Sequence, residues 1–294
     1  MVRTIQVLMC LAVVLAAPAQ VAAQQPFDLE QSVIDSLQPQ GGTVLLEPVE
    51  ARLDLGSDYV FYSPADTRKI LVELWDNAPM AAEGALGLVM PAGSDPRVDG
   101  WGALITFQPV GRVVDTATSE AENAILLAQM QALASEDNAR RRAQGAPAIM
   151  VTGWAQAPRY DRIRHTVSWA SELDVADSEV NTLNFDLRVL GRRGVLSLNI
   201  VSSIDQLHRV SRAAEDLAAR VTFAPGARYD DFDEAEDSSS GIGMAALIAG
   251  GAGLALAKHS GLAAIALKFA WPIVIGLSGL LALALLSLRQ RLRR

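Results

Sequence analysis

The sequence predicts an α+β domain with mixed, largely antiparallel sheets and two main surface helices, followed by a C-terminal transmembrane helix. Three observations predict this class. Short strand-like runs follow one another with turns between them, in place of the regular crossover helices of a parallel sheet. Two longer stretches have the apolar spacing of amphipathic helices. Near the C-terminus, residues 269–288 contain no charged side chain.

The first half of the chain predicts a small antiparallel sheet, a helix and two further strands. Ser63 can cap the helix, Pro64 suits its first position, and Asp66 favours its first turn. Its apolar spacing is set by Ile70, Leu71, Leu74 and Trp75. The strand-like runs are 43–47, 51–55 and 58–62 before the helix, and 84–91 and 100–109 after it.

The second half begins with a long helix, from Thr116 or Thr118 to Arg142. Its apolar stripe comprises Ile125, Leu126, Met130 and Leu133. Three arginines at 140–142 fit the negative end of the helix dipole, and this solvated helix end is favoured over an anion site. The remaining elements are strands at 148–154, 162–170, 180–190 and 194–202, and an amphipathic helix at 204–220.

The two ends of the chain predict export and anchoring. Residues 1–23 have a basic start, a short apolar core and a small-residue exit, which is typical of a cleavable signal peptide. Residues 269–288 are long enough to span a bilayer, and the tail 289–294 marks the cytoplasmic side. We therefore expect a single-pass protein of the cytoplasmic membrane with an exported, periplasmic domain. The basic residues beside the anchor are Arg289, Arg291, Arg293 and Arg294.

Composition divides the chain between these ends. Residues 24–226 form the expected exported domain, 227–240 an acidic, serine-rich tether, and 241–261 a Gly/Ala-rich apolar segment near the membrane. A second span at 241–257 would place the terminal arginines outside, so one span is favoured. Small residues at Ala249, Gly253 and Ala257 allow close helix packing, and chance explains this spacing equally well. A second copy of the chain or another envelope protein therefore remains open as a partner.

Charge and cysteine content limit the function classes. Between the signal and the apolar segment lie 33 acidic and 18 basic residues, a formal charge of −15. Such a surface repels nucleic acid, so no nucleic-acid partner is expected. Cys10, the chain's single cysteine, lies in the signal, which leaves the exported part without a disulfide or thiol nucleophile. No motif indicates a cofactor, and His165, His208 and His259 are too far apart in sequence to indicate a metal site.

The segment 153–170 concentrates the side chains that could carry chemistry. Asp161 and His165 are the candidate acid/base residues, and the candidate ligand-binding residues are Trp154, Arg159, Tyr160 and Trp169. The favoured alternative is an ordinary hairpin. Strict alternation would then bury Ile163, His165, Val167 and Trp169 and expose Arg162, Arg164, Thr166 and Ser168.

Several motifs resemble a bacterial family of membrane-anchored proteins, domain of unknown function 2167. These motifs include Leu74-Trp75, residues 86–89, Gly153-Trp154, Tyr160-Asp161, residues 190–196 and Ala245-Ala246-Leu247. The resemblance covers nearly the whole chain after the signal. It implies a membrane location and no particular reaction.

Two functional hypotheses follow. The favoured one is an envelope protein with a non-catalytic exported domain that binds a partner or ligand. The alternative is an envelope hydrolase acting on glycan, with Asp161 as acid or base and a flanking tryptophan as a stacking platform. The hydrolase requires a second carboxylate near Asp161, for which Glu172 and Asp174 are candidates.

Overall fold

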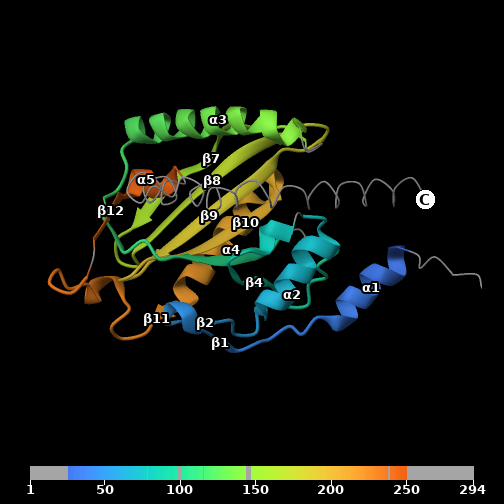
Figure 1. Cartoon of the computed structure of the whole chain (residues 1–294), viewed down its shortest axis with the longest axis horizontal. Helices are drawn as coiled ribbons and strands as arrows, with labels where there is room; N and C mark the ends of the chain where they lie inside the picture. Colours follow the sequence, from blue (N-terminus) through green and yellow to red (C-terminus); the bar gives the residue numbers. More distant parts are fainter. Residues whose placement is uncertain are drawn as a thin grey trace, which may run out of the picture.

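The computed structural model describes residues 26–249, apart from 78, 99, 100, 115, 144–146 and 238. Its centre is a seven-stranded sheet in which every neighbouring pair of strands is antiparallel (Figure 1). The predicted mixed α+β class with antiparallel sheets is confirmed. In spatial order the strands are β3 (Tyr59–Tyr62), β4 (Ala85–Pro91), β5 (Ala103–Gln108), β10 (Val195–Ser203), β9 (Thr182–Leu190), β8 (Thr166–Val175) and β7 (Ile149–Asp161).

Two smaller sheets flank this one. Strands β1 (Thr43–Leu46) and β2 (Ala51–Asp54) form the predicted N-terminal hairpin, which is completed by β11 (Val221–Phe223). β3 was expected in this small sheet, but it pairs with β4 at the edge of the large sheet. A parallel pair joins β6 (Arg112–Val114) to β12 (Ser239–Gly243).

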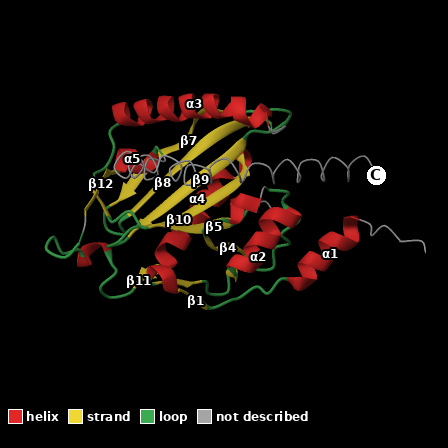
Figure 2. Ribbon diagram, viewed as in Figure 1, coloured by secondary structure: helices red, strands yellow, loops and turns green. Residues whose placement is uncertain are grey.

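The helices cover both faces of the large sheet (Figure 2). The two longest, α3 (Glu120–Ala143) and α4 (Leu207–Arg220), correspond to the two predicted surface helices. α3 packs along edge strand β7, whereas α4 packs against β9 and β10 from the opposite face. The other helices are α1 (Pro26–Ser36), α2 (Pro64–Lys69) and α5 (Met244–Ile248), with short 3₁₀ turns at Glu47–Val49, Pro79–Ala82, Ile204–Gln206 and Tyr229–Asp231.

Helix α2 begins as its sequence predicts. The Ser63 hydroxyl accepts a hydrogen bond from the Asp66 amide at 3.2 Å, and Pro64 occupies the first turn. After Lys69 the helix continues with π-type hydrogen bonding over Ile70–Leu74. The Asn77 side chain ends it by donating to the Leu71 carbonyl oxygen at 2.9 Å.

The buried face of α3 differs from the predicted stripe. Leu126 and Met130 are buried, but Ile125 and Leu133 are 58% and 43% exposed. The reason is a polar contact that hydropathy does not reveal. Asn138 accepts from the Ile149 amide at 2.8 Å and donates to the Ile149 carbonyl oxygen at 2.7 Å, which turns its own side of the helix toward β7.

The arginines at the end of α3 are not all solvated. Arg141 is buried and donates through Nε to the Pro147 carbonyl oxygen at 2.8 Å. Burial lowers the pKa of its guanidinium.

The segment expected as a tether is instead packed on the domain. Ala227 and Tyr229 are buried, and the Tyr229 hydroxyl donates to the Val113 carbonyl oxygen at 2.7 Å. The following residues enter β12 and α5, whose Ile242 and Met244 join a buried apolar cluster. This acidic segment has too few apolar residues to fold alone, but contacts with β6 and β8 bury its Tyr229 side chain.

No helix within the described part of the chain is long and apolar enough to cross a bilayer. The predicted signal 1–23, the apolar residues 250–261, the predicted span 269–288 and the predicted cytoplasmic tail 289–294 lie outside the described residues.

Candidate functional site

The candidate residues of 153–170 lie on the β7–β8 hairpin, and strand alternation separates them. Arg159 pairs with Ser168 and Asp161 with Thr166, so these side chains face α4. Tyr160 pairs with Val167 and packs with Trp154 and Trp169 on the opposite face, beside α5. The structure therefore does not bring Asp161 and the tryptophans into one site.

Asp161 has a structural partner set. Its Oδ1 accepts from the amides of Ile163 at 2.8 Å and Arg164 at 3.0 Å, and its Oδ2 pairs with Arg164 Nη1 at 2.7 Å. These contacts, led by the Arg164 side chain, hold the pKa of the Asp161 carboxyl below its usual range. A carboxylate stabilised in this way is a poor general acid at neutral pH.

The contacts of Asp161 also explain why the predicted alternation of buried and exposed side chains fails at the start of β8. Because the carboxylate caps a turn over 162–165, β8 begins only at Thr166, and Ile163 projects into solvent at 91% exposed. Val167 and Trp169 are buried as predicted, but Thr166 is buried as well. A sheet covered on both faces buries both sets of alternating residues.

A cleft of about 350 Å³ opens between the end of this hairpin and α4. We call it the hairpin–α4 cleft. Its floor is formed by buried Phe185 and Leu187 of β9 together with Ala214 of α4. Its charged lining comprises Arg159, Asp161, Arg164 and Glu215.

Polar contacts fix the walls of the cleft. Gln156 of β7 donates to the Ser168 hydroxyl at 3.3 Å and accepts from the Ser211 hydroxyl of α4 at 3.2 Å. At the other end of α4, Arg220 pairs with Asp58 at 2.6 Å and with Asp216 at 2.9 Å. Gln156 thus ties α4 to the hairpin that lines the cleft, whereas Arg220 ties the C-terminal end of α4 to Asp58, which precedes β3.

Glu215 is the carboxylate that sequence reasoning missed. It lies 54 residues from Asp161 in a helix whose polar face reads as ordinary solvated surface. The two carboxylates named as candidates from the sequence lie elsewhere. Glu172 accepts from Asn181 at 2.8 Å, and Asp174 pairs with Met150 near the other end of β8.

His165 lies in the turn, not on the strand. Its backbone has φ +50°, and its ring stacks on Tyr229 with centroids 4.4 Å apart. Nδ1 lies 3.3 Å from the Tyr160 hydroxyl, and Nε2 lies 3.1 Å from the carboxylate of Asp230. This arrangement attaches the hairpin to the segment that precedes β12.

Trp169 belongs to a buried polar cluster on the face opposite α4. The ion pair at its centre joins Arg188 Nη2 to Asp186 Oδ1 at 2.8 Å, and the Arg188 guanidinium lies 5.3 Å from the Trp169 ring centroid. Asn184 and Asn199 donate to the two Asp186 oxygens at 3.1 and 3.2 Å. Burial raises the pKa of the Asp186 carboxyl, against the lowering effect of Arg188 and the two amides.

Trp154 and Trp169 are poorly placed as an open stacking platform. Trp169 is fully buried, and Trp154 is half-buried with Nε1 donating to the Asn123 carbonyl oxygen of α3 at 3.1 Å. Among the residues that the structure describes, no three His, Cys, Asp or Glu side chains gather to form a metal site.

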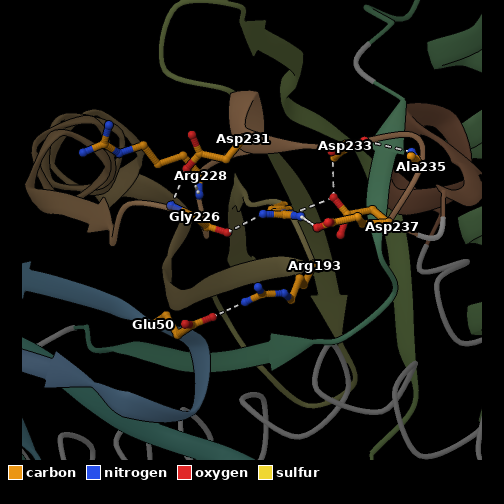
Figure 3. A network of polar contacts seen from close by, with 10 residues as sticks. Glu50, Arg193, Gly226, Arg228, Asp231, Asp233, Ala235 and Asp237 are labelled. Atoms are coloured by element: carbon orange, nitrogen blue, oxygen red, sulfur yellow. Dashed lines mark hydrogen bonds and ion pairs between the residues drawn. The ribbon is translucent and has the colours of Figure 1, made fainter.

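A second polar network joins the loop after β9 to the C-terminal part of the domain (Figure 3). Arg192 donates through Nε to Asp237 at 2.6 Å and through Nη1 to the Gly226 carbonyl oxygen at 3.2 Å. Figure 3 also shows Asp231 accepting from the amides of Gly226 and Arg228, and Arg193 paired with Glu50.

Comparison with known proteins places the chain in a family. The family model described as "Protein of unknown function (DUF2167)" matches residues 38–284. The chain belongs to this family. The resemblance predicted from the motifs is therefore confirmed, and the DUF2167 match covers the whole hairpin–α4 cleft.

No curated protein matches this DUF2167 chain. One similar solved structure is the solution structure of cyanobacterial PsbP (CyanoP) from Synechocystis sp. PCC 6803. It has 9% sequence identity and a TM-score of 0.35, with 64% of this chain and 92% of that chain covered.

Proposed function

We propose that this DUF2167 protein is a single-pass envelope protein whose exported domain binds a small polar ligand in the hairpin–α4 cleft and does no chemistry on it. The observation that carries the binding role is the cleft itself. It combines an apolar floor with a few charged groups, which is the usual composition of a ligand site. Its volume of about 350 Å³ lies within the range of small-molecule pockets.

The partners of Asp161 support a role without catalysis. Its two oxygens accept two backbone amides and one guanidinium, and these contacts keep the carboxylate ionised. Its role in the cleft is therefore to fix the turn that carries Arg164.

The alternative function, glycan hydrolysis, is favoured by one observation. Glu215 lines the same cleft as Asp161, and a glycosidase needs two carboxylates around the scissile bond. The tryptophans that would stack a sugar lie on the other face of the sheet. Purified full-length protein and its Glu215→Gln variant, incubated with peptidoglycan, separate the two functions. Glycan cleavage that Glu215→Gln abolishes would replace the binding proposal.

The location is proposed from the sequence alone. The charge-free stretch 269–288 and the four arginines after it support a C-terminal anchor with the tail in the cytoplasm. Residues 239–248 belong to the folded domain, so reporter fusions should follow them. Alkaline phosphatase should be active when fused after His259, and green fluorescent protein should fluoresce only after Arg294. The reverse result would mean two spans.

A further inference from the structure

We propose that the hairpin–α4 cleft binds a zwitterionic ligand, an amino acid or short peptide with free termini, with its carboxylate at Arg159 and its ammonium group at Glu215. This inference rests on the proposed binding function and names the ligand class.

Two of the four charged groups in the cleft are already paired. Arg164 and Asp161 lie 2.7 Å apart, and Asp161 also accepts two backbone amides. Arg159 and Glu215 are exposed, and neither side chain has an ion pair or hydrogen bond within the part of the chain that the structure describes. One positive and one negative group are therefore left to meet a ligand.

These two groups come from different walls. Arg159 extends from the end of β7 on the face that carries Ser168, and Glu215 extends from α4. The buried side chains of Phe185 and Leu187 lie in the floor between the walls. A ligand that reaches both charged groups must therefore cross an apolar surface, which suits a short backbone with small side chains.

Charge complementarity selects among ligand classes. Glu215 repels an anion, Arg159 repels a cation, and a neutral ligand leaves both charges unmatched. A ligand with a carboxylate at one end and an ammonium group at the other matches both. The Arg159 guanidinium can hold a carboxylate by two parallel hydrogen bonds, which a point charge cannot do.

The test uses full-length protein in detergent micelles and follows the methyl NMR signals of Ala214 and Ala218, which line the cleft. Three probes differ only at their ends: the dipeptide Ala-Ala, its N-acetylated form without the ammonium group, and its C-terminal amide without the carboxylate. Ala-Ala should shift both methyl signals. Each blocked form should bind about tenfold more weakly, because it loses one charged hydrogen-bonding partner.

Two variants assign each end of the ligand. Arg159→Gln should weaken Ala-Ala about tenfold and make Ala-Ala and its amide bind equally. Glu215→Gln should also weaken Ala-Ala about tenfold, and it should make Ala-Ala and its N-acetylated form bind equally. Arg142→Gln and Glu136→Gln on α3 are the matched controls, because that helix lies on the opposite face, and both should bind like the unaltered protein.

The outcomes separate this inference from the proposed function. Equal binding of all three dipeptides, or full affinity in both cleft variants, would overturn the zwitterion assignment. A shift with acetate or N-acetylglucosamine and none with Ala-Ala would overturn the ligand class and leave the binding function standing. If none of the probes shifted either methyl signal, both proposals would fail.

Discussion

The Arg192 guanidinium and the Asp237 carboxylate lie 2.6 Å apart, Nε to Oδ2, and join the loop after β9 to the residues that precede β12. The bond spans 45 residues of chain. It holds the acidic segment 227–237 against the domain.

Asp237→Asn should loosen the segment 227–237. The variant removes the charge that Arg192 pairs with and weakens the acceptor for the Asp233 amide, which lies 2.8 Å from the carboxylate. Amide hydrogen exchange should therefore be faster across this segment and unchanged in β8 and β9. Glu234→Gln is the matched control, because its side chain is exposed. Equal exchange in the variant and the control would contradict the role of the bond.

Arg188→Met should destabilise the domain in a pH-dependent way. Removing one partner of a buried ion pair typically costs about 3–5 kcal/mol, because the other charge is left buried. Burial already raises the pKa of the Asp186 carboxyl, and loss of Arg188 raises it further. A carboxyl whose pKa is raised by folding contributes stability that is fully present at pH values below its unfolded-state pKa of about 3.9. This contribution is lost as pH rises through its folded-state pKa.

Urea unfolding of the Arg188→Met variant should therefore show a large loss of unfolding free energy, relative to the unaltered protein, at pH 7 and a smaller loss near pH 3. Replacing both partners, as in Asp186→Leu with Arg188→Met, should cost less than the sum of the two single changes. Equal losses of unfolding free energy at the two pH values would show that the ion pair does not control this stability.

Asp161→Asn should lower the unfolding free energy by about 1 kcal/mol at pH 7, because the turn loses charge-assisted hydrogen bonds at a partly exposed site. Folding lowers the pKa of this carboxyl, so its contribution to stability is present above its unfolded-state pKa of about 3.9. The contribution disappears as pH falls through the folded-state pKa. The variant and the unaltered protein should thus become equally stable in strong acid. Glu179→Gln, an exposed change at another turn, should have no effect at either pH. A difference that persists in acid would point to packing instead of charge.

Gly87→Ala should destabilise the sheet, whereas Gly153→Ala should be tolerated. A Cβ at position 87 would lie 2.1 Å from the Phe61 ring and 2.7 Å from the Tyr62 carbonyl oxygen, so β3 would have to move. Overpacking of this kind typically costs about 1–3 kcal/mol. A Cβ at position 153 meets nothing within 4 Å, although it too lies in a strand. Thermal unfolding of the two variants gives the comparison, and a similar loss in both would refute the steric explanation.

Local sequence signals predicted most of the secondary structure. Capping by Ser63, the strand runs that became β4, β5, β9 and β10, and the two long helices all depend on residues close together in the chain. The predicted strand starting at 162 failed because the Asp161 carboxylate binds two backbone amides and forms a turn. That competition between side chain and backbone has no hydropathy signal.

The candidate site divides in the same way. Side chains alternate between the two faces along β7 and β8. Once the register of these strands is known, this alternation places Asp161 and Trp169 on different faces. The register itself depends on bulges in β7, and the arrival of Glu215 in the cleft depends on how α4 crosses the sheet. Neither can be obtained from spacing in the chain.

The sequence by itself determined most of the strands, the two long helices, the acidic character of residues 24–238 and membership in the DUF2167 family, because each depends on local pattern and composition. Only the tertiary structure decided that Ala227 and Tyr229 are buried, that Asp186 and Arg188 are buried, and that Arg159 and Glu215 share a cleft. These outcomes depend on contacts between residues far apart in the chain, whose burial and charge are set by the neighbours that folding brings to them.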